Sequence, residues 1–240
     1  GREQGTVEFK NVSFRYPHAS EDELSNISFK INKGQTLAII GATGSGKTTL
    51  ISLIPRFYDA TDGEVLVDGV NVKNYKFDTL YDKLGYVTQK AVLFAGSIRE
   101  NVFFGESAAP ETDEELKNAI ELSQAEEFVD KLPDGAEHMI SQMGRNVSGG
   151  QKQRLSIARA LSRKPEILVF DDSFSALDYK TDAKLREGLN EKLKDTTKII
   201  VAQRISTIRH ADKIIVLDRG EAVGMGTHEE LMKNCDVYKE

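Results

Sequence analysis

The stretch that decides the fold is Gly41-Ala42-Thr43-Gly44-Ser45-Gly46-Lys47-Thr48-Thr49, which matches the phosphate-binding pattern G-x-x-x-x-G-K-[ST]. Before it lie four apolar residues, Leu37 to Ile40, which indicate a buried strand. After it we expect a helix from Lys47 to about Phe57. A glycine-rich turn between a strand and a helix is the context that this pattern requires. The sequence therefore predicts a P-loop.

Each part of this loop has a physical role toward a phosphate group. The glycines allow backbone amides to turn inward around an anion, and the positive end of the helix dipole adds to them. Lys47 would reach the β- and γ-phosphates, and the Thr48 hydroxyl would ligate Mg²⁺. A glycine-rich turn without a ligand is the alternative, and the Lys-Thr pair argues against it. The residues expected to bind ATP here are Gly41, Thr43, Gly44, Ser45, Gly46, Lys47, Thr48 and Thr49.

A carboxylate is expected on a neighbouring strand. Ile167 to Phe170 are four apolar residues, and Asp171 follows them directly. Ligands of open α/β sheets bind at the carboxyl ends of the strands. Asp171 is therefore expected to hold Mg²⁺ through water. An Asp that merely caps a strand end is the alternative, and the P-loop makes it the weaker one.

The remaining pattern predicts the fold class. Strand signals with apolar residues run over 7–16, 64–67, 198–202 and 213–217, and a helix is expected over 151–163. Asp68-Gly69, directly after the strand at 64–67, indicates the turn of a hairpin. Strands alternating with helices indicate an α/β protein with a mainly parallel core sheet. The stretch from about 90 to 160 is interpreted as a mostly helical insertion into that core.

Composition excludes some classes of protein. Of the 240 residues, 39% are hydrophobic and 29% charged, as in ordinary globular proteins. The net charge of −6 argues against a nucleic-acid partner. The single cysteine, Cys235, cannot form an internal disulfide, which suits a reducing cytosol. Apolar runs are far shorter than the roughly 20 residues of a membrane span, so the chain alone is expected to be soluble, even if it is a piece of a membrane protein.

A third motif lies between the P-loop and Asp171. It reads Asn146-Val147-Ser148-Gly149-Gly150-Gln151-Lys152-Gln153-Arg154. Ser148 and the amides of Gly149 and Gly150 would make a second phosphate-binding helix N-terminus. An N-capped helix with flexible glycines is the alternative. In this place the sequence strongly resembles the nucleotide-binding domain of ATP-binding cassette (ABC) transporters, whose signature reads Leu-Ser-Gly-Gly-Gln. The resemblance implies that Ser148, Gly149, Gly150 and Gln151 act on ATP bound to a partner domain.

The resemblance covers nearly the whole chain. It implies a P-loop NTPase (RecA-like) core, an antiparallel β subdomain and an inserted helical subdomain, all within one domain over 1–240. The core and β subdomain would occupy about 1–89 and 160–240, and the helical subdomain about 90–159. ATP and Mg²⁺ are the implied cofactors.

Further positions match the family one by one. Tyr16 matches the aromatic residue that stacks on adenine, and Gln89 matches the glutamine that ligates Mg²⁺ and begins the loop that senses the membrane domain. Ser175-Ala176-Leu177-Asp178 matches the loop that crosses the dimer interface, with Asp178 at that interface. The last match is Gly226-Thr227-His228-Glu229-Glu230-Leu231, the family's usual ending.

One further segment looks like the exporter subgroup, in which this domain follows a membrane domain in the same polypeptide. The segment runs from Leu93 to Val102. An apolar patch around Phe94 and Ile98 would suit a groove for a membrane-domain helix. The alternative is that both side chains fill the core of the helical lobe.

Two departures from the family pattern lie in the expected catalytic pocket. Asp172 stands where the family has its general-base glutamate, and its carboxylate should fall about 1 Å or more short of the attacking water, a displacement that can cost on the order of 10²-fold in rate. Gln203 stands where the family has a histidine that contacts the γ-phosphate, and glutamine cannot carry a proton or a charge. Either change alone could be tolerated. Together they predict a site that binds ATP and hydrolyses it poorly. A smaller departure is Gln142, where exporters often have an acidic residue.

The family's geometry converts these departures into a prediction about partners. Two such domains sandwich two ATP molecules, each between the P-loop of one domain and the signature of the other. A homodimer of this chain would have two weakened sites, although its signature is intact. A heterodimer is therefore predicted, at the cytoplasmic face of the cell membrane, with a non-identical second nucleotide-binding domain and the chain's own transmembrane domain.

The sequence is compatible with three functions. The leading one is the energy-coupling ATPase domain of a heterodimeric multidrug-type exporter. The second is a regulatory module that holds ATP without significant turnover. The third, a cassette ATPase of DNA repair or translation, usually shows a long coiled-coil insertion or two cassettes in one chain, and the sequence has neither.

Overall fold

The central feature of the fold is a six-stranded sheet in the order β12-β11-β3-β10-β9-β6. The computed structural model describes residues 3–240. Five of the six strands are parallel, and only β12 pairs antiparallel, with β11. The mainly parallel α/β sheet predicted from the sequence is thus confirmed. Its strands are β3 (Thr36–Gly41), β6 (Leu84–Val87), β9 (Ile167–Asp171), β10 (Thr197–Val201), β11 (Lys213–Asp218) and β12 (Glu221–Gly226).

A second, antiparallel sheet lies beside the first in the order β2-β1-β4-β5, and a two-stranded ribbon pairs β7 with β8. The hairpin expected at 64–69 is present, because Asp68 and Gly69 both have positive φ (53° and 77°), as a two-residue type I′ turn requires. The strands are β1 (Val7–Phe14), β2 (Leu24–Ile31), β4 (Asp62–Val67), β5 (Val70–Asn71), β7 (Gly96–Ser97) and β8 (Met139–Ile140).

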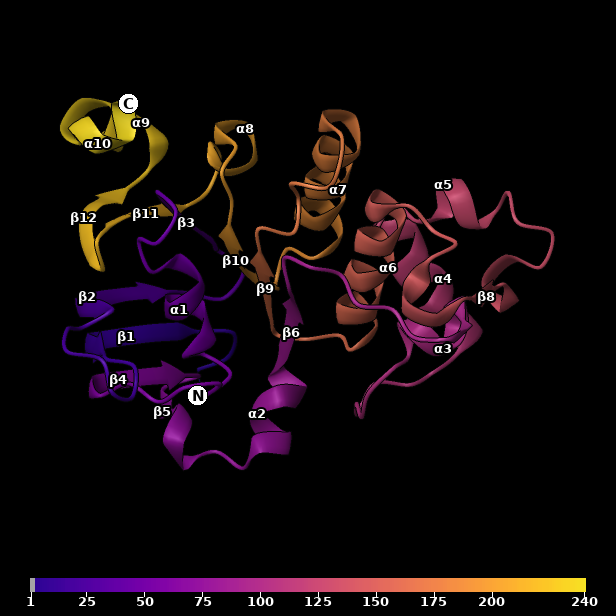
Figure 1. The fold of residues 1–240 in the computed structure, drawn as a ribbon, viewed down its shortest axis with the longest axis horizontal. Coiled ribbons are helices and arrows are strands. Elements are labelled where there is room, and N and C mark those ends of the chain that lie inside the picture. Colours follow the sequence, from indigo (N-terminus) through magenta and orange to yellow (C-terminus); the bar gives the residue numbers. More distant parts are fainter. Residues whose placement is uncertain (1–2) are drawn as a thin grey trace.

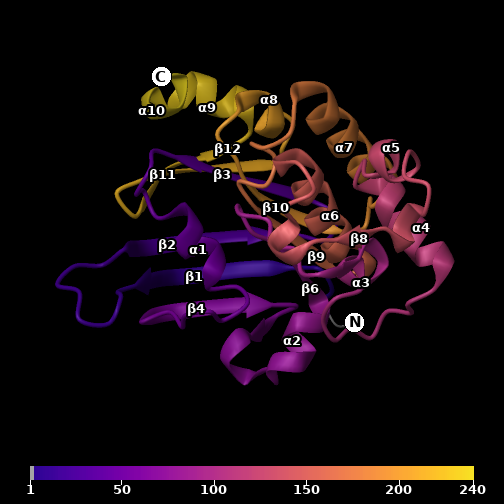
Figure 2. The same ribbon diagram turned by 45° about the vertical axis from the view of Figure 1, so that its right-hand side comes forward.

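The helices divide between the layers. Helix α1 lies between the two sheets, and α3 to α6 gather at one side of the molecule (Figures 1 and 2). The helices are α1 (Lys47–Ser52), α2 (Phe77–Lys83), α3 (Ile98–Val102), α4 (Asp113–Leu122), α5 (Glu126–Val129), α6 (Gly149–Ser162), α7 (Tyr179–Lys192), α8 (Ile205–Ile208), α9 (His228–Asn234) and α10 (Asp236–Lys239), with short 3₁₀ turns at Val72–Asn74, Gly135–Glu137 and Gln142–Gly144.

The side chains of the central strands point alternately into two separate hydrophobic cores. On β9, Leu168 and Phe170 join the core that contains α6 and α7, whereas Ile167 and Val169 join the core that contains α1 and the antiparallel sheet. All four side chains are fully buried. Since successive side chains of a strand point to opposite faces, the apolar run of β9 contributes to both cores. The P-loop strand β3 of the same sheet also lies between these layers, because Ala38 belongs to the first core and Leu37 and Ile39 to the second.

The helix after the P-loop is shorter than predicted. It ends at Ser52 instead of Phe57, and turns follow it to residue 58. Pro55 has no amide hydrogen to donate into a continuing helix, and Arg56 takes a positive φ of 61°. The predicted first strand is also too long, because β1 ends at Phe14 and Tyr16 lies in the loop beyond it.

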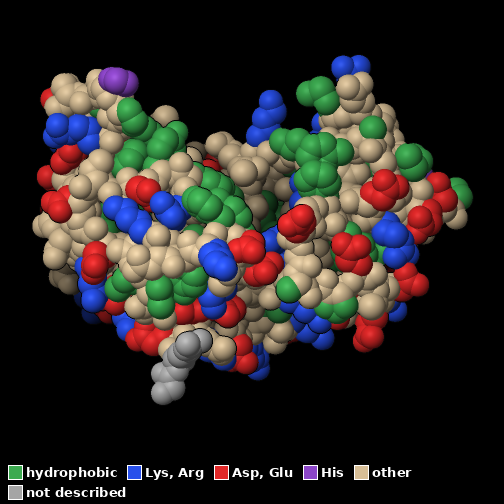
Figure 3. Space-filling model, turned by 90° about the horizontal axis from the view of Figure 1, so that it is seen from below, with side chains coloured by type: hydrophobic (Ala, Val, Ile, Leu, Met, Phe, Trp, Pro, Cys, Tyr) green, Lys and Arg blue, Asp and Glu red, His purple; other side chains and the backbone are tan. Residues whose placement is uncertain are grey.

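The surface is hollowed between the two halves of the molecule when it is seen from below, and hydrophobic side chains gather on both sides of this hollow (Figure 3). The right-hand half in that view is the part that contains α3 to α6. None of the helices that the structure describes combines the length and the apolar character that a bilayer crossing needs.

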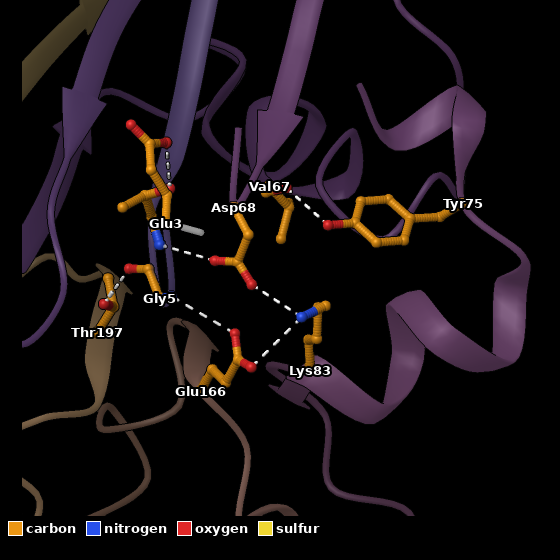
Figure 4. A network of polar contacts seen from close by, with 9 residues as sticks. Glu3, Gly5, Val67, Asp68, Tyr75, Lys83, Glu166 and Thr197 are labelled. Atoms are coloured by element: carbon orange, nitrogen blue, oxygen red, sulfur yellow. Dashed lines mark hydrogen bonds and ion pairs between the residues drawn. The ribbon is translucent and has the colours of Figure 1, made fainter. Parts of the chain in front are cut away.

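A polar network joins the strand ends farthest from the P-loop (Figure 4). Asp68 accepts hydrogen bonds from the Thr6 amide (3.1 Å) and from Lys83 Nζ (2.8 Å). Lys83 Nζ also donates to Glu166 Oε1 (3.3 Å), and Glu166 Oε2 accepts from the Gly5 amide (3.4 Å). The network therefore ties the segment before β1 to the β4–β5 turn, to the end of α2 and to the start of β9.

Candidate functional site

The P-loop and the carboxyl ends of β9 and β10 enclose a cavity of about 260 Å³. The cavity brings together most of the residues that the sequence predicted for phosphate, Mg²⁺ and catalysis. It is lined by Glu23, Thr43, Gly44, Ser45, Gly46, Lys47, Thr48, Thr49, Gln89, Asp171, Asp172, Val201 and Gln203. Glu23 and Val201 are the two lining residues that the sequence did not predict. Neither carries a motif that could have marked it.

The P-loop backbone has a shape that two of its glycines make possible. Gly46, at the N-cap of α1, has a φ of 104°, and a Cβ there would lie 2.8 Å from Leu24 Cδ2. A Cβ at Gly41 would collide with Ser45 Oγ and with the carbonyl oxygen of Leu217. Side chains at these two positions would thus strain or displace the loop, which keeps its backbone open toward the cavity.

Lys47 places its ammonium group at the mouth of the loop. Its Nζ donates to the carbonyl oxygens of Gly41 and Ala42, the latter at 3.1 Å. Partial burial lowers the pKa of Lys47, and the nearby charges of Asp172 and Asp171 act in the opposite direction. The lysine therefore supplies positive charge at the place where the sequence predicts phosphate.

Thr48 and Asp171 lie together as a hydroxyl–carboxylate pair. Thr48 Oγ1 donates to Asp171 Oδ1 at 3.3 Å. Burial raises the pKa of Asp171, and the bond from Thr48 opposes this rise. In the part of the chain that the structure describes, no group of three or more His, Cys, Asp or Glu side chains could hold a metal by itself. One carboxylate and one hydroxyl are nevertheless a donor set that fits Mg²⁺ bound together with nucleotide phosphates.

An orphan polar atom supports the same fit. The Oγ of Ser45 is buried without a hydrogen-bond partner, and it is the only such side-chain atom found within residues 3–240. Leaving a buried hydroxyl unpaired costs about 1–3 kcal/mol. Because Ser45 lines the cavity, a phosphate oxygen in the loop would give this hydroxyl an acceptor.

The signature residues are not among those that line this cavity. Ser148 is the N-cap of α6: its Oγ accepts from the Gln151 amide (3.2 Å), and Gln151 Oε1 accepts from the Ser148 amide (3.1 Å). The capped helix that the sequence left as an alternative is thus present. Gly149 is exposed with open space around its Cβ position, so the helix N-terminus stays accessible.

Comparisons with known proteins identify the family of the chain. The sequence model of the ABC transporter family matches residues 24–175. The chain belongs to the ABC transporter family. It is 44% identical over 236 residues to the putative multidrug export ATP-binding/permease protein YgaD of Bacillus subtilis, covering 98% of this chain and 40% of that protein. It is 43% identical over 236 residues to the putative multidrug export ATP-binding/permease protein SAOUHSC_02003 of Staphylococcus aureus, with the same coverage.

A solved structure supports the fold independently. The structure described as a bacterial Atm1-family ABC exporter with ATP bound superposes on this ABC domain with a TM-score of 0.92 at 35% identity, covering 98% of this chain and 41% of that one. This ABC domain spans about two fifths of the length of the curated relatives that it matches. The predicted P-loop NTPase fold is confirmed, and ATP with Mg²⁺ is the cofactor that the family implies.

Asp172 has an unusual backbone for a residue with a side chain. Its φ is 49°, in the left-handed region, where Asp and Asn are better tolerated than most residues. Its amide donates to the carbonyl of Val201 (2.8 Å), and Gln89 Nε2 donates to its Oδ2 (3.2 Å). Burial raises the pKa of Asp172, while the charges of Lys47 and Arg204 lower it. The carboxylate is thus fixed beside the P-loop lysine.

Gln203 lies on another wall of the cavity, in the loop after β10, and its side chain is exposed. The structure therefore brings both departures from the family pattern into one pocket. Their roles in catalysis stay predictions.

Tyr16 contacts the P-loop although it is not one of the cavity-lining residues. Its hydroxyl forms a hydrogen bond with Thr49 Oγ1 (2.7 Å). Its ring meets Phe14 and Tyr58 edge-on, with ring centroids 4.8 Å and 5.2 Å away. These contacts fix the orientation of the Tyr16 ring at the edge of the P-loop, where the ABC resemblance places adenine.

The remaining predicted residues lie outside this pocket. Asp178 is the N-cap of α7, and its carboxylate accepts from the Thr181 amide (2.8 Å). Ile98 is fully buried in the core, which contradicts its predicted place in a surface patch, whereas Phe94 is 41% exposed. Ile98 follows the N-cap Ser97 of a short helix whose inner face packs against α6, and this position turns its side chain inward.

Proposed function

We propose that this chain is the ATP-hydrolysing motor domain of a heterodimeric exporter, and that its own nucleotide site is degenerate. Its P-loop would hold Mg-ATP and hydrolyse it slowly, because the Asp172 carboxylate is too short and Gln203 cannot carry charge. Its signature, Ser148 to Gln151, would complete the fully equipped site of a non-identical partner domain. Within the chain, residues 90–159 would act as the helical subdomain that carries this signature.

The observation that carries the proposal is the environment of Asp172. Its carboxylate is held by Gln89 at 3.2 Å, and its backbone is fixed in the left-handed region by the bond to Val201. Because both its side chain and its backbone are held by hydrogen bonds, Asp172 has little freedom to bring its carboxylate the missing ~1 Å closer to an attacking water. Such a displacement costs on the order of 10²-fold in rate.

The exposed N-terminus of α6 supports the second half of the proposal. Ser148 uses its hydroxyl oxygen to cap the helix, which leaves the hydroxyl hydrogen free to donate. Gly149 is exposed beside it, and these residues lie outside the chain's own cavity. A helix N-terminus of this kind favours an anion. A nucleotide brought by another domain would supply one.

An aromatic patch supports a membrane-domain partner and hence a place at the cytoplasmic face of a membrane. Phe94 and Phe104 are 41% and 52% exposed, and their rings stack with centroids 4.3 Å apart. The guanidinium of Arg159 lies 5.5 Å and 5.6 Å from the two centroids. The relatives named as ATP-binding/permease proteins combine both functions in one chain, so the patch would receive a segment of the permease part.

The test compares ATP turnover of the wild-type chain with that of Asp172→Glu combined with Gln203→His. We expect the double variant to hydrolyse ATP at least about 10-fold faster, with nucleotide affinity within about 2-fold. Equal turnover of the two proteins would overturn the degenerate-site proposal. In a complex with the partner domain, Ser148→Arg should stop most of the hydrolysis. If hydrolysis continued unchanged, the chain would be a regulatory nucleotide-binding subunit instead of a motor.

A further inference from the structure

A buried carboxylate in α7 contacts the segment that follows Gln203. Asp182 lies in α7, and its side chain is only 1% exposed. Its Oδ1 accepts from Arg186 Nε (2.7 Å). Its Oδ2 accepts from Thr207 Oγ1 (2.9 Å) and from Arg204 Nη1 (3.5 Å). We refer to Asp182, Arg186, Arg204 and Thr207 as the Asp182 cluster.

Arg204 links this cluster to the two loops that reach the cavity. It directly follows Gln203 in the loop after β10. Its Nη2 donates to the carbonyl oxygen of Ser175 (3.1 Å), in the loop after β9. Ser175 Oγ in turn donates to the carbonyl oxygen of Asp172 (3.0 Å). One planar guanidinium therefore bridges α7 and both loops, which the single charge of a lysine could not do.

We propose that Asp182 and Arg204 are positioning residues that hold Asp172 and Gln203 in a fixed relation across the nucleotide cavity. Neither of the two lines the cavity, so they act through the loops and not on the nucleotide. Asp182 orients the guanidinium, and the guanidinium holds the Ser175 carbonyl next to the segment of Gln203. This inference rests on the proposed function only where turnover is measured.

The cluster is built so that its loss should separate catalysis from binding. The P-loop and α1 make most of the phosphate site, and the loop has backbone contacts outside the cluster, such as the bond from the Gly220 amide to the carbonyl oxygen of Ser45 (2.9 Å). The cluster fixes only the opposite walls, where Asp172 and Gln203 lie. Loosening these walls would misplace groups that act on the reacting atoms, and a misplacement of about 1 Å can cost on the order of 10²-fold.

A matched control is available inside the cluster. Arg186 pairs with the same carboxylate at 2.7 Å, but its contact stays within α7, at four residues' separation. Arg186→Gln therefore removes an ion pair from Asp182 without touching the bridge to the loops. Arg204→Lys keeps the charge and removes the bridge, and Asp182→Asn keeps the shape and removes the charge.

The first measurement is amide hydrogen exchange of the full chain, which does not depend on ATP turnover. Asp182→Asn and Arg204→Lys should each speed amide exchange at residues 172–176 and 203–207 by about 10-fold or more, while residues 41–49 keep the wild-type rate. Arg186→Gln should leave all three segments unchanged. The inference would be overturned if both bridge variants exchanged at the wild-type rate. It would also be overturned if Arg186→Gln sped exchange as much as the bridge variants do.

The second measurement places the same substitutions in the Asp172→Glu, Gln203→His chain. There we expect kcat to fall about 10-fold or more for the two bridge variants, and the affinity for a fluorescent ATP analogue with Mg²⁺ to stay within about 2-fold. A fall in affinity matching the fall in kcat would show a merely structural role. Should that chain hydrolyse ATP no faster than wild type, the degenerate-site proposal would fail while the exchange experiment would still decide this one.

Discussion

Replacing Lys83 with methionine tests the polar network that ties the segment before β1 to the sheet. Lys83 Nζ lies 2.8 Å from Asp68 and 3.3 Å from Glu166, and these carboxylates are 6% and 32% exposed. Methionine preserves much of the apolar stem and removes the charge. The two carboxylates are then left facing each other without a cation.

The magnitude follows from the exposure of the two partners. A hydrogen bond to a charged group contributes about 1.5–3 kcal/mol, and the buried Asp68 should be near the upper end. The contact with Glu166 is longer and more exposed, so about 0.5 kcal/mol is expected from it. We therefore expect Lys83→Met to lower the free energy of unfolding by about 3 kcal/mol at pH 7.

The pH dependence has a definite sign. Its two carboxylate partners raise the pKa of Lys83 against the effect of burial, so its contribution is fully present below its unfolded pKa of about 10.4 and is lost as the pH rises through the folded value. Bonds from Glu166, Lys83 and the Thr6 amide outweigh burial and lower the pKa of Asp68, so its contribution is present above about pH 4 and is lost as the pH falls through the folded value. The effect of the substitution should thus be largest between about pH 5 and 9.

The assay is urea unfolding followed by circular dichroism, because the chain contains no tryptophan to serve as a fluorescent reporter. Lys117→Met is the control: Lys117 is 74% exposed and lies 3.8 Å from Glu121, so a change below about 0.5 kcal/mol is expected. A loss below about 1 kcal/mol for Lys83→Met at pH 7, or an equal loss at pH 3, would refute the reasoning.

Three further predictions test the site and its surroundings. Gly46→Ala should cost about 1–3 kcal/mol of stability and at least about 10-fold in ATP affinity, because φ is 104° and the new methyl group meets Leu24; unchanged affinity in a titration would contradict this. Tyr16→Phe should retain ATP affinity within about 3-fold while Tyr16→Ala loses about 10-fold or more, since stacking needs only the ring; equal losses would instead make the hydroxyl bond to Thr49 the important contact. Ile98→Ala should lower stability by about 2–5 kcal/mol and Phe94→Ala by less than about 1 kcal/mol, and thermal unfolding that ranks them the other way would show that their burial has been misread.

The elements that the sequence predicted well are those with an uninterrupted local signal. The P-loop lies between a strand and a helix as expected, and the apolar run at 167–170 is a buried strand that ends at Asp171. These predictions succeeded because the residues that determine them are neighbours in the chain. The two-residue turn at Asp68 and Gly69 succeeded for the same reason.

Of the predictions that failed, one concerned a local signal and one depends on contacts from a distant part of the chain. The periodicity of residues 47–57 did not show that Pro55 and Arg56 would end α1 at Ser52. No local pattern distinguishes Ile98 in the core from Phe94 on the surface. Their difference arises from the packing of α3 against α6, which lies some fifty residues farther along the chain.

The structure also suggests that the two departures in the nucleotide pocket are not equivalent. Asp172 lies at a φ of 49°, where a longer, unbranched glutamate is tolerated less well than aspartate. A glutamate there must also keep or replace the bond from Gln89 Nε2. Gln203 is exposed on the cavity wall, and a histidine could occupy its place without disturbing packed atoms. We therefore expect Gln203→His to be nearly neutral for stability, whereas Asp172→Glu should cost about 1 kcal/mol. The short carboxylate would then be the change that the surrounding backbone favours.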